Sequence, residues 1–204
     1  MGGTALSQEQ IQRVVDFHGH WCPGLAIGIR AGEFVLREFG RAADEEIVAV
    51  VETDMCGVDA IQMLTGCTLG KGNLLHLDHG KMAFRFYRRS DEKGVRLVFD
   101  ADRLGGPSDA MAALQQKRAA GTLTAEERQA LDTHRAEWSE RIMGADLADV
   151  FRIRPAAGPV PRRARLMQSL ACEACGEKTM ETRTRRFEGR TLCLPCFERL
   201  DRRV

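Results

Sequence analysis

The sequence lacks any long hydrophobic run. No stretch of its 204 residues approaches the roughly 18 consecutive apolar residues that a membrane helix needs, so we expect no membrane association. The first ten residues have neither a basic flank nor a long apolar run, and we therefore expect no secretory signal and a cytoplasmic protein. Without an export signal, seven cysteines, an odd number, favour metal binding or reactive thiols over a disulfide framework.

The overall charge is also small, but it is unevenly distributed. The formal net charge is +1, whereas the residues from Pro159 onward contain 11 Lys and Arg against 6 Asp and Glu. The rest of the chain is therefore negative. Hydrophobic and charged contents of 44% and 29% are ordinary for a soluble globular protein. This distribution indicates two separate units, of which the basic one could meet an acidic partner.

The hydrophobic patterns predict an α+β N-terminal domain, a mixed sheet with helices. Residues 47–51 form a continuous, mostly β-branched run that is typical of a buried strand. Further strands are predicted at 74–77, 82–87 and 95–99, and helices at 7–18, 23–40, 58–64, 107–120 and 124–143. We assign residues 1–153 to this domain, 154–168 to a linker rich in proline and arginine, and 169–204 to a small four-cysteine zinc finger.

The last segment has the ligand spacing of a structural zinc site. Cys172 and Cys175 form one CxxC pair, and Cys193 and Cys196 form a second pair 17 residues later. Zinc prefers four ligands in a tetrahedron, and two CxxC turns supply them, as in a zinc ribbon or treble-clef finger. Residues 188–189 suit the turn of a hairpin between the pairs, and 197–200 can start a helix. Redox-active pairs, free thiols or iron remain the alternatives.

The role of the basic tail is a separate question. Arg183, Arg185 and Arg186 could contact phosphates of a nucleic acid. The tail has few aromatic residues for stacking on bases, however, so a solvated charged face is the commoner explanation. Nucleic-acid binding is therefore disfavoured but not excluded.

A second group of metal-ligand residues lies near the N-terminus. His18, His20 and Cys22 are spaced by two, and in an extended segment their side chains would share one face. Cys22 precedes Pro23 at a predicted helix start, where the helix dipole favours a thiolate. Cys56 has a similar setting, between a buried strand and a helix. These four residues are candidates for a second metal site, and Cys22, Cys56 and His20 are also candidate catalytic residues.

Other polar residues near these positions could contact a ligand. Asp54 and Asp59 flank Cys56 and could orient a histidine or accept protons. Cys67 lies in a glycine-rich loop, and Lys71 of the same loop could bind an anionic group. The loop does not have the spacing of a nucleotide-binding P-loop, which excludes that class of NTPase.

Four stretches together resemble one known family. They are 18–28 (HGHWCPGLAIG), 56–62 (CGVDAIQ), 65–73 (TGCTLGKGN) and 78–84 (DHGKMAF). The first is similar to an H-x-H-x-C-P-G motif and the last to D-x-G-K-x-A-F, both found in the FmdE family of formylmethanofuran dehydrogenase subunits. The resemblance covers about residues 10–150. Trp21, where an aliphatic residue is common, is a mild departure from the pattern.

The resemblance implies an α+β domain, a homodimer and a C-terminal zinc finger like that of many members, which could pack on the other protomer. It also implies association with a molybdenum or tungsten formylmethanofuran dehydrogenase, or a relative of it, whose catalytic pterin and iron–sulfur groups belong to other chains of the complex.

Three hypotheses about the function follow from the residues and the resemblance together. The protein is a metal-binding accessory protein, a thiolate-dependent enzyme using Cys22 or Cys56 with His20 as base, or an adaptor acting through the basic zinc finger.

Overall fold

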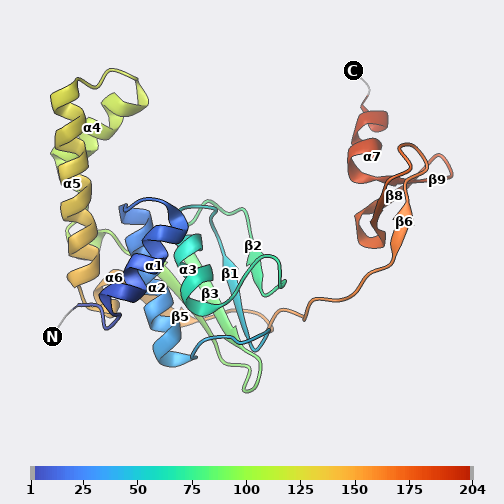
Figure 1. Ribbon diagram of the computed structural model, residues 1–204, viewed down its shortest axis with the longest axis horizontal. Coiled ribbons are helices and arrows are strands. Elements are labelled where there is room, and N and C mark those ends of the chain that lie inside the picture. The colour runs from blue at the N-terminus through green and yellow to red at the C-terminus, as the bar shows by residue number, and fades with distance from the viewer. Residues whose placement is uncertain (1–2, 203–204) are drawn as a thin grey trace. The chain divides into compact units, whose positions relative to one another are not determined.

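The chain forms two compact units, Met1–Arg163 and Ala164–Val204. A computed structural model describes residues 3–202. The helices of the first unit are α1 (Gln8–His18), α2 (Pro23–Glu38), α3 (Gly57–Thr65), the short 3-10 helix η1 (Asp102–Leu104), α4 (Asp109–Ala119), α5 (Ala125–Gly144) and α6 (Leu147–Val150). Its strands are β1 (Ile47–Val51), β2 (Leu74–His76), β3 (Ala83–Arg88), β4 (Gly94–Phe99) and β5 (Phe151–Pro155). Figure 1 shows these elements in order along the chain.

The five strands form one mixed sheet in the order β2-β1-β3-β4-β5. Strands β1 and β2 are parallel, and the remaining neighbours are antiparallel. The parallel pair places the carboxyl ends of β1 and β2 at the same edge of the sheet, where the polar residues discussed below begin. The predicted α+β class with a mixed sheet is confirmed.

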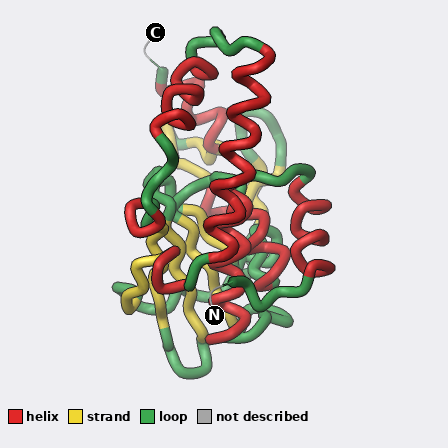
Figure 2. Tube along the Cα trace, turned by 90° about the vertical axis from the view of Figure 1, so that its left-hand side faces the viewer, coloured by secondary structure: helices red, strands yellow, loops and turns green. Residues whose placement is uncertain are grey.

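Alternating residues of β1 separate the two faces of the sheet. Ile47, Ala49 and Val51 belong to the main core, which the sheet forms with the helices of this unit (Figure 2). Val48 and Val50 point to the other face, where they pack with Tyr87 against residues 156–160 of the linker. The Tyr87 hydroxyl donates to the Ala157 carbonyl at 3.2 Å. Strand β1 is therefore buried on both faces, which explains why its sequence is continuously apolar.

Glycines allow α2 and α3 to approach closely. A Cβ atom added to Gly28 would lie 2.2 Å from the carbonyl oxygen of Gly57, and one added to Gly32 would lie 2.7 Å from the side chain of Leu64. No larger residue fits at Gly28 without moving a backbone. This close contact positions the N-termini of both helices, which carry the cysteines of the candidate site.

Two elements of the first unit differ from the prediction. The helix predicted from Pro107 begins at Asp109, because the Ser108 hydroxyl caps it by accepting from the Met111 amide. Strand β5 was not predicted, and it extends to Pro155, the second residue assigned to the linker. Its pairing with β4 along Arg96 and Arg154 is a long-range contact that no local pattern reports.

The second unit is small. It contains the hairpin of β6 (Ser169–Ala171) and β7 (Lys178–Met180), the 3-10 helix η2 (Glu181–Arg183), the hairpin of β8 (Thr184–Phe187) and β9 (Arg190–Cys193), and α7 (Leu194–Asp201). Glu188 and Gly189 both have positive φ, 48° and 78°, as the predicted hairpin turn requires. Helix α7 starts before the last cysteine, not after it, so Cys196 lies in its first turn.

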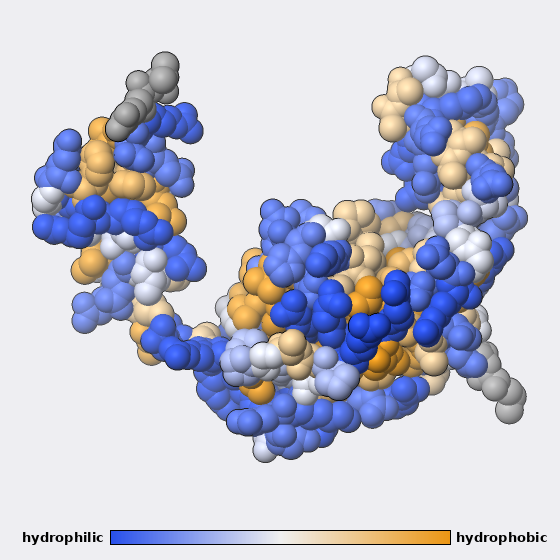
Figure 3. All heavy atoms as spheres, turned by 180° about the vertical axis from the view of Figure 1, so that it is seen from behind, coloured by the Kyte–Doolittle hydropathy of each residue, from blue (hydrophilic) through white to orange (hydrophobic). Residues whose placement is uncertain are grey.

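The face of each unit shown in Figure 3 is mostly hydrophilic, with groups of hydrophobic residues between. Among the described residues, no helix combines the length and the apolar character needed to cross a membrane.

Candidate metal centre

The histidines and the first cysteine lie around the junction of α1 and α2. His18 is the last residue of α1, and Gly19 follows it with φ 91°, a left-handed conformation that glycine adopts easily. Cys22 is the N-cap of α2, and Pro23 is its first residue, as predicted. The expectation of an extended segment from His18 to Cys22 is wrong, because α1 continues through His18 and the chain turns at Gly19.

The turn nevertheless brings the predicted ligands together. One ligand atom each from His18, His20, Cys22 and Cys56 lies within 4.8 Å of the others. Cys56 reaches the group from the N-cap of α3. A Cβ atom added to Gly24 would lie 3.3 Å from the Cβ of Cys56, so the glycine makes room for this approach. Two imidazole nitrogens and two thiol sulfurs form a donor set that suits zinc, iron or cobalt and disfavours magnesium or calcium.

Asp59 orients His18. The Nδ1 of His18 lies 2.7 Å from the Oδ2 of Asp59, and the His18 side chain is largely buried. Because the carboxylate accepts a hydrogen bond, it favours the tautomer in which Nδ1 carries the proton. The His18 Nε2 is then free to accept, and it is buried without a hydrogen-bond partner. A histidine held by a carboxylate on one nitrogen, with the other nitrogen unpaired, is typical of a metal ligand.

The two thiols of the cluster have different surroundings. The Leu25 amide donates to the sulfur of the buried Cys22 at 3.4 Å, through the first turn of α2. Cys56 is half-buried, and burial raises the pKa of its thiol, with Cys22 adding to the effect. Without a cation, Cys56 therefore stays protonated at neutral pH, which disfavours it as a free nucleophile.

A cavity of about 380 Å³ borders this cluster on the side of β2. Its wall includes His18 and Cys56, the carboxylates of Asp54 and Asp59, and His76. His76 was not predicted from the sequence. A signal was present, because parallel strands end at the same edge of a sheet and His76 ends β2 where β1 leads toward Cys56.

Two predicted ligand residues lie elsewhere. Cys67 is completely buried in the main core, where its thiol donates to the Ile47 carbonyl at 3.4 Å, and burial raises its pKa. The Nζ of Lys71 donates to the Asp44 carbonyl at 3.1 Å. The structure brings neither residue to the His18–Cys56 cluster. Cys67 ties the glycine-rich loop to the first residue of β1, and Lys71 ties it to the segment that precedes this strand.

The second unit contains a separate cluster of four cysteines. One sulfur each from Cys172, Cys175, Cys193 and Cys196 lies within 4.8 Å of the others. The first pair lies in the turn between β6 and β7, and the second pair spans the start of α7. In the described part of this unit, the buried core contains Leu192 and three of the cysteines, Cys172, Cys193 and Cys196, with Phe187 and Phe197 packed beside it.

Backbone amides prepare this second cluster for a cation. The Cys193 amide donates to the sulfur of Cys172 at 3.3 Å, and together with neighbouring amides it lowers the pKa of Cys172 to about 6. The adjacent thiols raise the pKa of Cys196 to about 12. Four thiolates at this distance repel one another unless a cation lies between them, so the arrangement favours a bound metal ion.

Comparisons with known proteins match one family model to each of the two units. Residues 17–152 match the family model described as FmdE, Molybdenum formylmethanofuran dehydrogenase operon. The chain belongs to the FmdE family. The matched range includes all four residues of the His18–Cys56 cluster. Residues 166–202 match the prokaryotic dksA/traR C4-type zinc finger, so this FmdE-family chain carries a C-terminal zinc finger, as the resemblance implied.

Two individual proteins are similar to this FmdE-family chain. The "Probable S-adenosyl-L-methionine-binding protein" of Archaeoglobus fulgidus is 31% identical over 192 residues, which are 90% of this chain. The chain spans about half (51%) of that relative's length. The crystal structure of a tungsten formylmethanofuran dehydrogenase FmdE-like protein from Syntrophus aciditrophicus is 24% identical, with a TM-score of 0.63. That match covers 99% of this chain and 100% of the other, and it shows the shared fold.

Proposed function

We propose that the protein is a metal-binding accessory protein whose N-terminal unit holds a transition-metal ion through His18, His20, Cys22 and Cys56. The observation that supports this most strongly is the placement of all four ligand atoms within 4.8 Å of one another. The unpaired, buried Nε2 of His18 adds to it, because an ion would satisfy that nitrogen. A second ion, a structural zinc, is proposed for the four cysteines of the finger.

The surrounding residues have defined tasks in this proposal. Asp59 keeps the His18 Nε2 directed at the cluster, and the α2 amide at Leu25 stabilises negative charge on Cys22. The cavity beside Cys56 leaves room for a ligand next to the cluster. A cation would also lower the pKa of Cys56, which burial raises in its absence. The alternative is an enzyme that uses Cys22 or Cys56 as a thiolate with His20 as base. It is disfavoured at Cys56, because burial raises the pKa of that thiol.

Metal analysis of the full-length protein, purified without oxygen, tests this proposal. We expect about two metal ions per chain in the wild type and one in His18→Ala, since each cluster holds one ion. His134→Ala is the matched control, because His134 contacts Glu137 on α5 and is not part of either cluster. A single zinc per chain that disappears completely in Cys172→Ser would contradict the N-terminal site.

The name of the Archaeoglobus fulgidus relative supports a second candidate function. We propose that the cavity beside Cys56 binds S-adenosyl-L-methionine, with the sulfonium cation near Asp54. Asp54 is exposed at the cavity wall, and among residues 3–202 no Lys, Arg or His nitrogen lies within 4.0 Å of its carboxylate. A carboxylate without a cationic partner at the cavity wall would attract the positive sulfonium group of a ligand bound in the cavity.

Calorimetric titration tests this candidate with a chemical control. Asp54→Asn should weaken binding of S-adenosyl-L-methionine about fivefold, which corresponds to roughly 1 kcal/mol at a solvated site. Binding of S-adenosyl-L-homocysteine, which lacks the positive charge, should not change. No saturable binding of either compound to the wild type would eliminate the candidate. The homodimer, the molybdenum or tungsten dehydrogenase partner and the cytoplasmic location stay predictions.

A further inference from the structure

The helical hairpin of α4 and α5 contains a cleft that the proposed metal function does not use. The two helices lie side by side (Figure 1), and a cavity of about 320 Å³ lies between them. Its wall includes Arg118 of α4 and both Arg128 and Arg135 of α5. Gly121, with φ 69°, turns the chain between the helices and thereby allows Leu123 to complete the wall.

The positive charge of this cleft is not neutralised within the protein. Among the described residues, no carboxylate oxygen lies within 4.0 Å of the guanidinium nitrogens of Arg118, Arg128 or Arg135. The neighbouring Lys117, by contrast, is paired with Glu127. Acidic residues are not scarce here, since residues 109–144 contain six Asp and Glu against five Lys and Arg. Three of the five basic residues are thus gathered at one cavity, whose lining contains a single carboxylate, Asp132.

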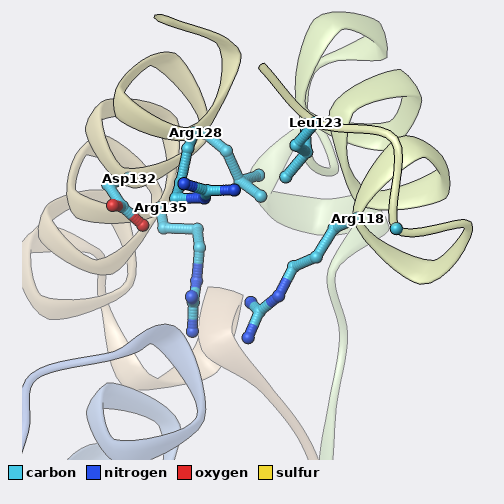
Figure 4. A pocket seen from close by; sticks show the side chains of 7 residues that line it. Arg118, Leu123, Arg128, Asp132 and Arg135 are labelled. Atoms are coloured by element: carbon cyan, nitrogen blue, oxygen red, sulfur yellow. The ribbon is translucent and has the colours of Figure 1, made fainter. Parts of the chain in front are cut away.

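The directions of the side chains agree with a shared ligand. Figure 4 shows the guanidinium groups of Arg118 and Arg135 extending from opposite helices toward the same space. Asp132 lies at the edge of the cleft, away from Arg118. Leu131, which is 2% exposed, and the half-buried Leu123 supply an apolar part of the wall. The cavity therefore combines a cationic side with an apolar side.

We propose that this cleft binds a phosphorylated small molecule. Its phosphate groups would lie between Arg118, Arg128 and Arg135, and its organic part would contact Leu123 and Leu131. Guanidinium groups bind phosphate oxygens through paired hydrogen bonds, and several of them together match an anion with more than one negative charge. A volume of about 320 Å³ falls at the lower end of ligand pockets, which leaves room for a small organic group beside the phosphate.

Titration of the full-length protein with pyrophosphate at physiological ionic strength tests this site. We expect saturable binding of one pyrophosphate per chain, weakened at least about tenfold in the double variant Arg118→Gln/Arg135→Gln. The control is Arg183→Gln/Arg185→Gln, which removes the same charge from exposed arginines of the zinc finger and should leave the affinity unchanged. Thermal unfolding of each variant establishes that the hairpin is still folded.

Three outcomes would overturn the proposal. Equal weakening by both double variants would show non-specific attraction to basic charge. Citrate binding that is tighter than pyrophosphate binding would assign the cleft to carboxylates. Binding of RNA that becomes tighter with oligonucleotide length, with no saturable pyrophosphate binding, would assign the arginines to a nucleic-acid surface. Failure of the metal proposal would leave this test unaffected, because the cleft shares no residue with either metal cluster.

Discussion

Replacing Cys172 with serine is expected to unfold the C-terminal unit while the N-terminal unit stays folded. The core of the C-terminal unit consists of three cysteines that are themselves candidate ligands, Leu192 and two partly buried phenylalanines. This is too little apolar surface to compensate for the conformational entropy of about 40 residues. Metal binding at such a site contributes on the order of 10 kcal/mol, which is then the folding energy of the unit.

Hydrogen exchange followed by mass spectrometry measures this effect in each unit separately. Peptides from residues 164–204 should exchange at unfolded rates in Cys172→Ser, whereas peptides from β1 and β3 should remain as protected as in the wild type. Met180→Ala is the control, because Met180 belongs to the same unit but is 58% exposed. Undiminished protection of α7 and β9 in Cys172→Ser would contradict a metal-dependent fold.

Replacing Glu52 with glutamine is expected to destabilise the N-terminal unit by about 3 kcal/mol. Glu52 is completely buried on the sheet face opposite the helices, and its carboxylate accepts hydrogen bonds from Arg96 at 2.7 Å and from Arg85 at 2.8 Å. The hydrogen bonds from Arg96 and Arg85 lower the pKa of Glu52 to about 2. The Glu52→Gln substitution removes the negative charge and leaves the guanidinium charges of Arg85 and Arg96 without compensation.

The lowered pKa of Glu52 also predicts that the stability of the N-terminal unit depends on pH. In the unfolded chain Glu52 has its ordinary pKa of 4.5, so lowering the pH below that value protonates the unfolded state first. The contribution of Glu52 is therefore complete above about pH 4.5 and is lost as the pH falls toward 2, and it amounts to roughly 3 kcal/mol. In Glu52→Gln this part of the acid sensitivity should disappear.

Urea denaturation followed by tryptophan fluorescence measures both effects, because Trp21 and Trp138 both lie in the N-terminal unit. Glu9→Gln is the matched control, since the Glu9–Arg13 pair is exposed and such pairs contribute little. Equal stability of Glu52→Gln and the wild type at pH 7 would show that the buried ion pair only balances its desolvation cost.

The sequence predicts much of the fold where the signals are local. The β-branched run of β1, the capping boxes at Ser7 and Thr124 and the turn at Gly189 are all visible in the sequence, and the structure confirms them. Strand β5 lacks such a signal, because its stability comes from pairing with β4 about 55 residues earlier in the chain. Its residues also lack a regular alternation of buried and exposed side chains, since Phe151 is buried whereas Ile153 is 40% exposed.

The candidate site was predictable in its residues but not in its geometry. Clustering of His18, His20 and Cys22 was visible in the sequence, although their proximity depends on a left-handed glycine and not on an extended segment. Cys56 joins them because Gly24, Gly28 and Gly57 permit two helices to meet. The anion cleft was not predictable, since Arg118 and Arg135 approach one another only when α4 and α5 fold back together.

Cobalt substitution tests the N-terminal metal centre most directly. In a full-length variant with the four finger cysteines replaced by serine, one equivalent of Co²⁺ should produce a thiolate-to-cobalt charge-transfer band. The band should vanish when Cys22 and Cys56 are also replaced by serine. A cobalt-loaded variant that shows no thiolate band, or one whose band survives the loss of both cysteines, would contradict the metal site formed by His18, His20, Cys22 and Cys56.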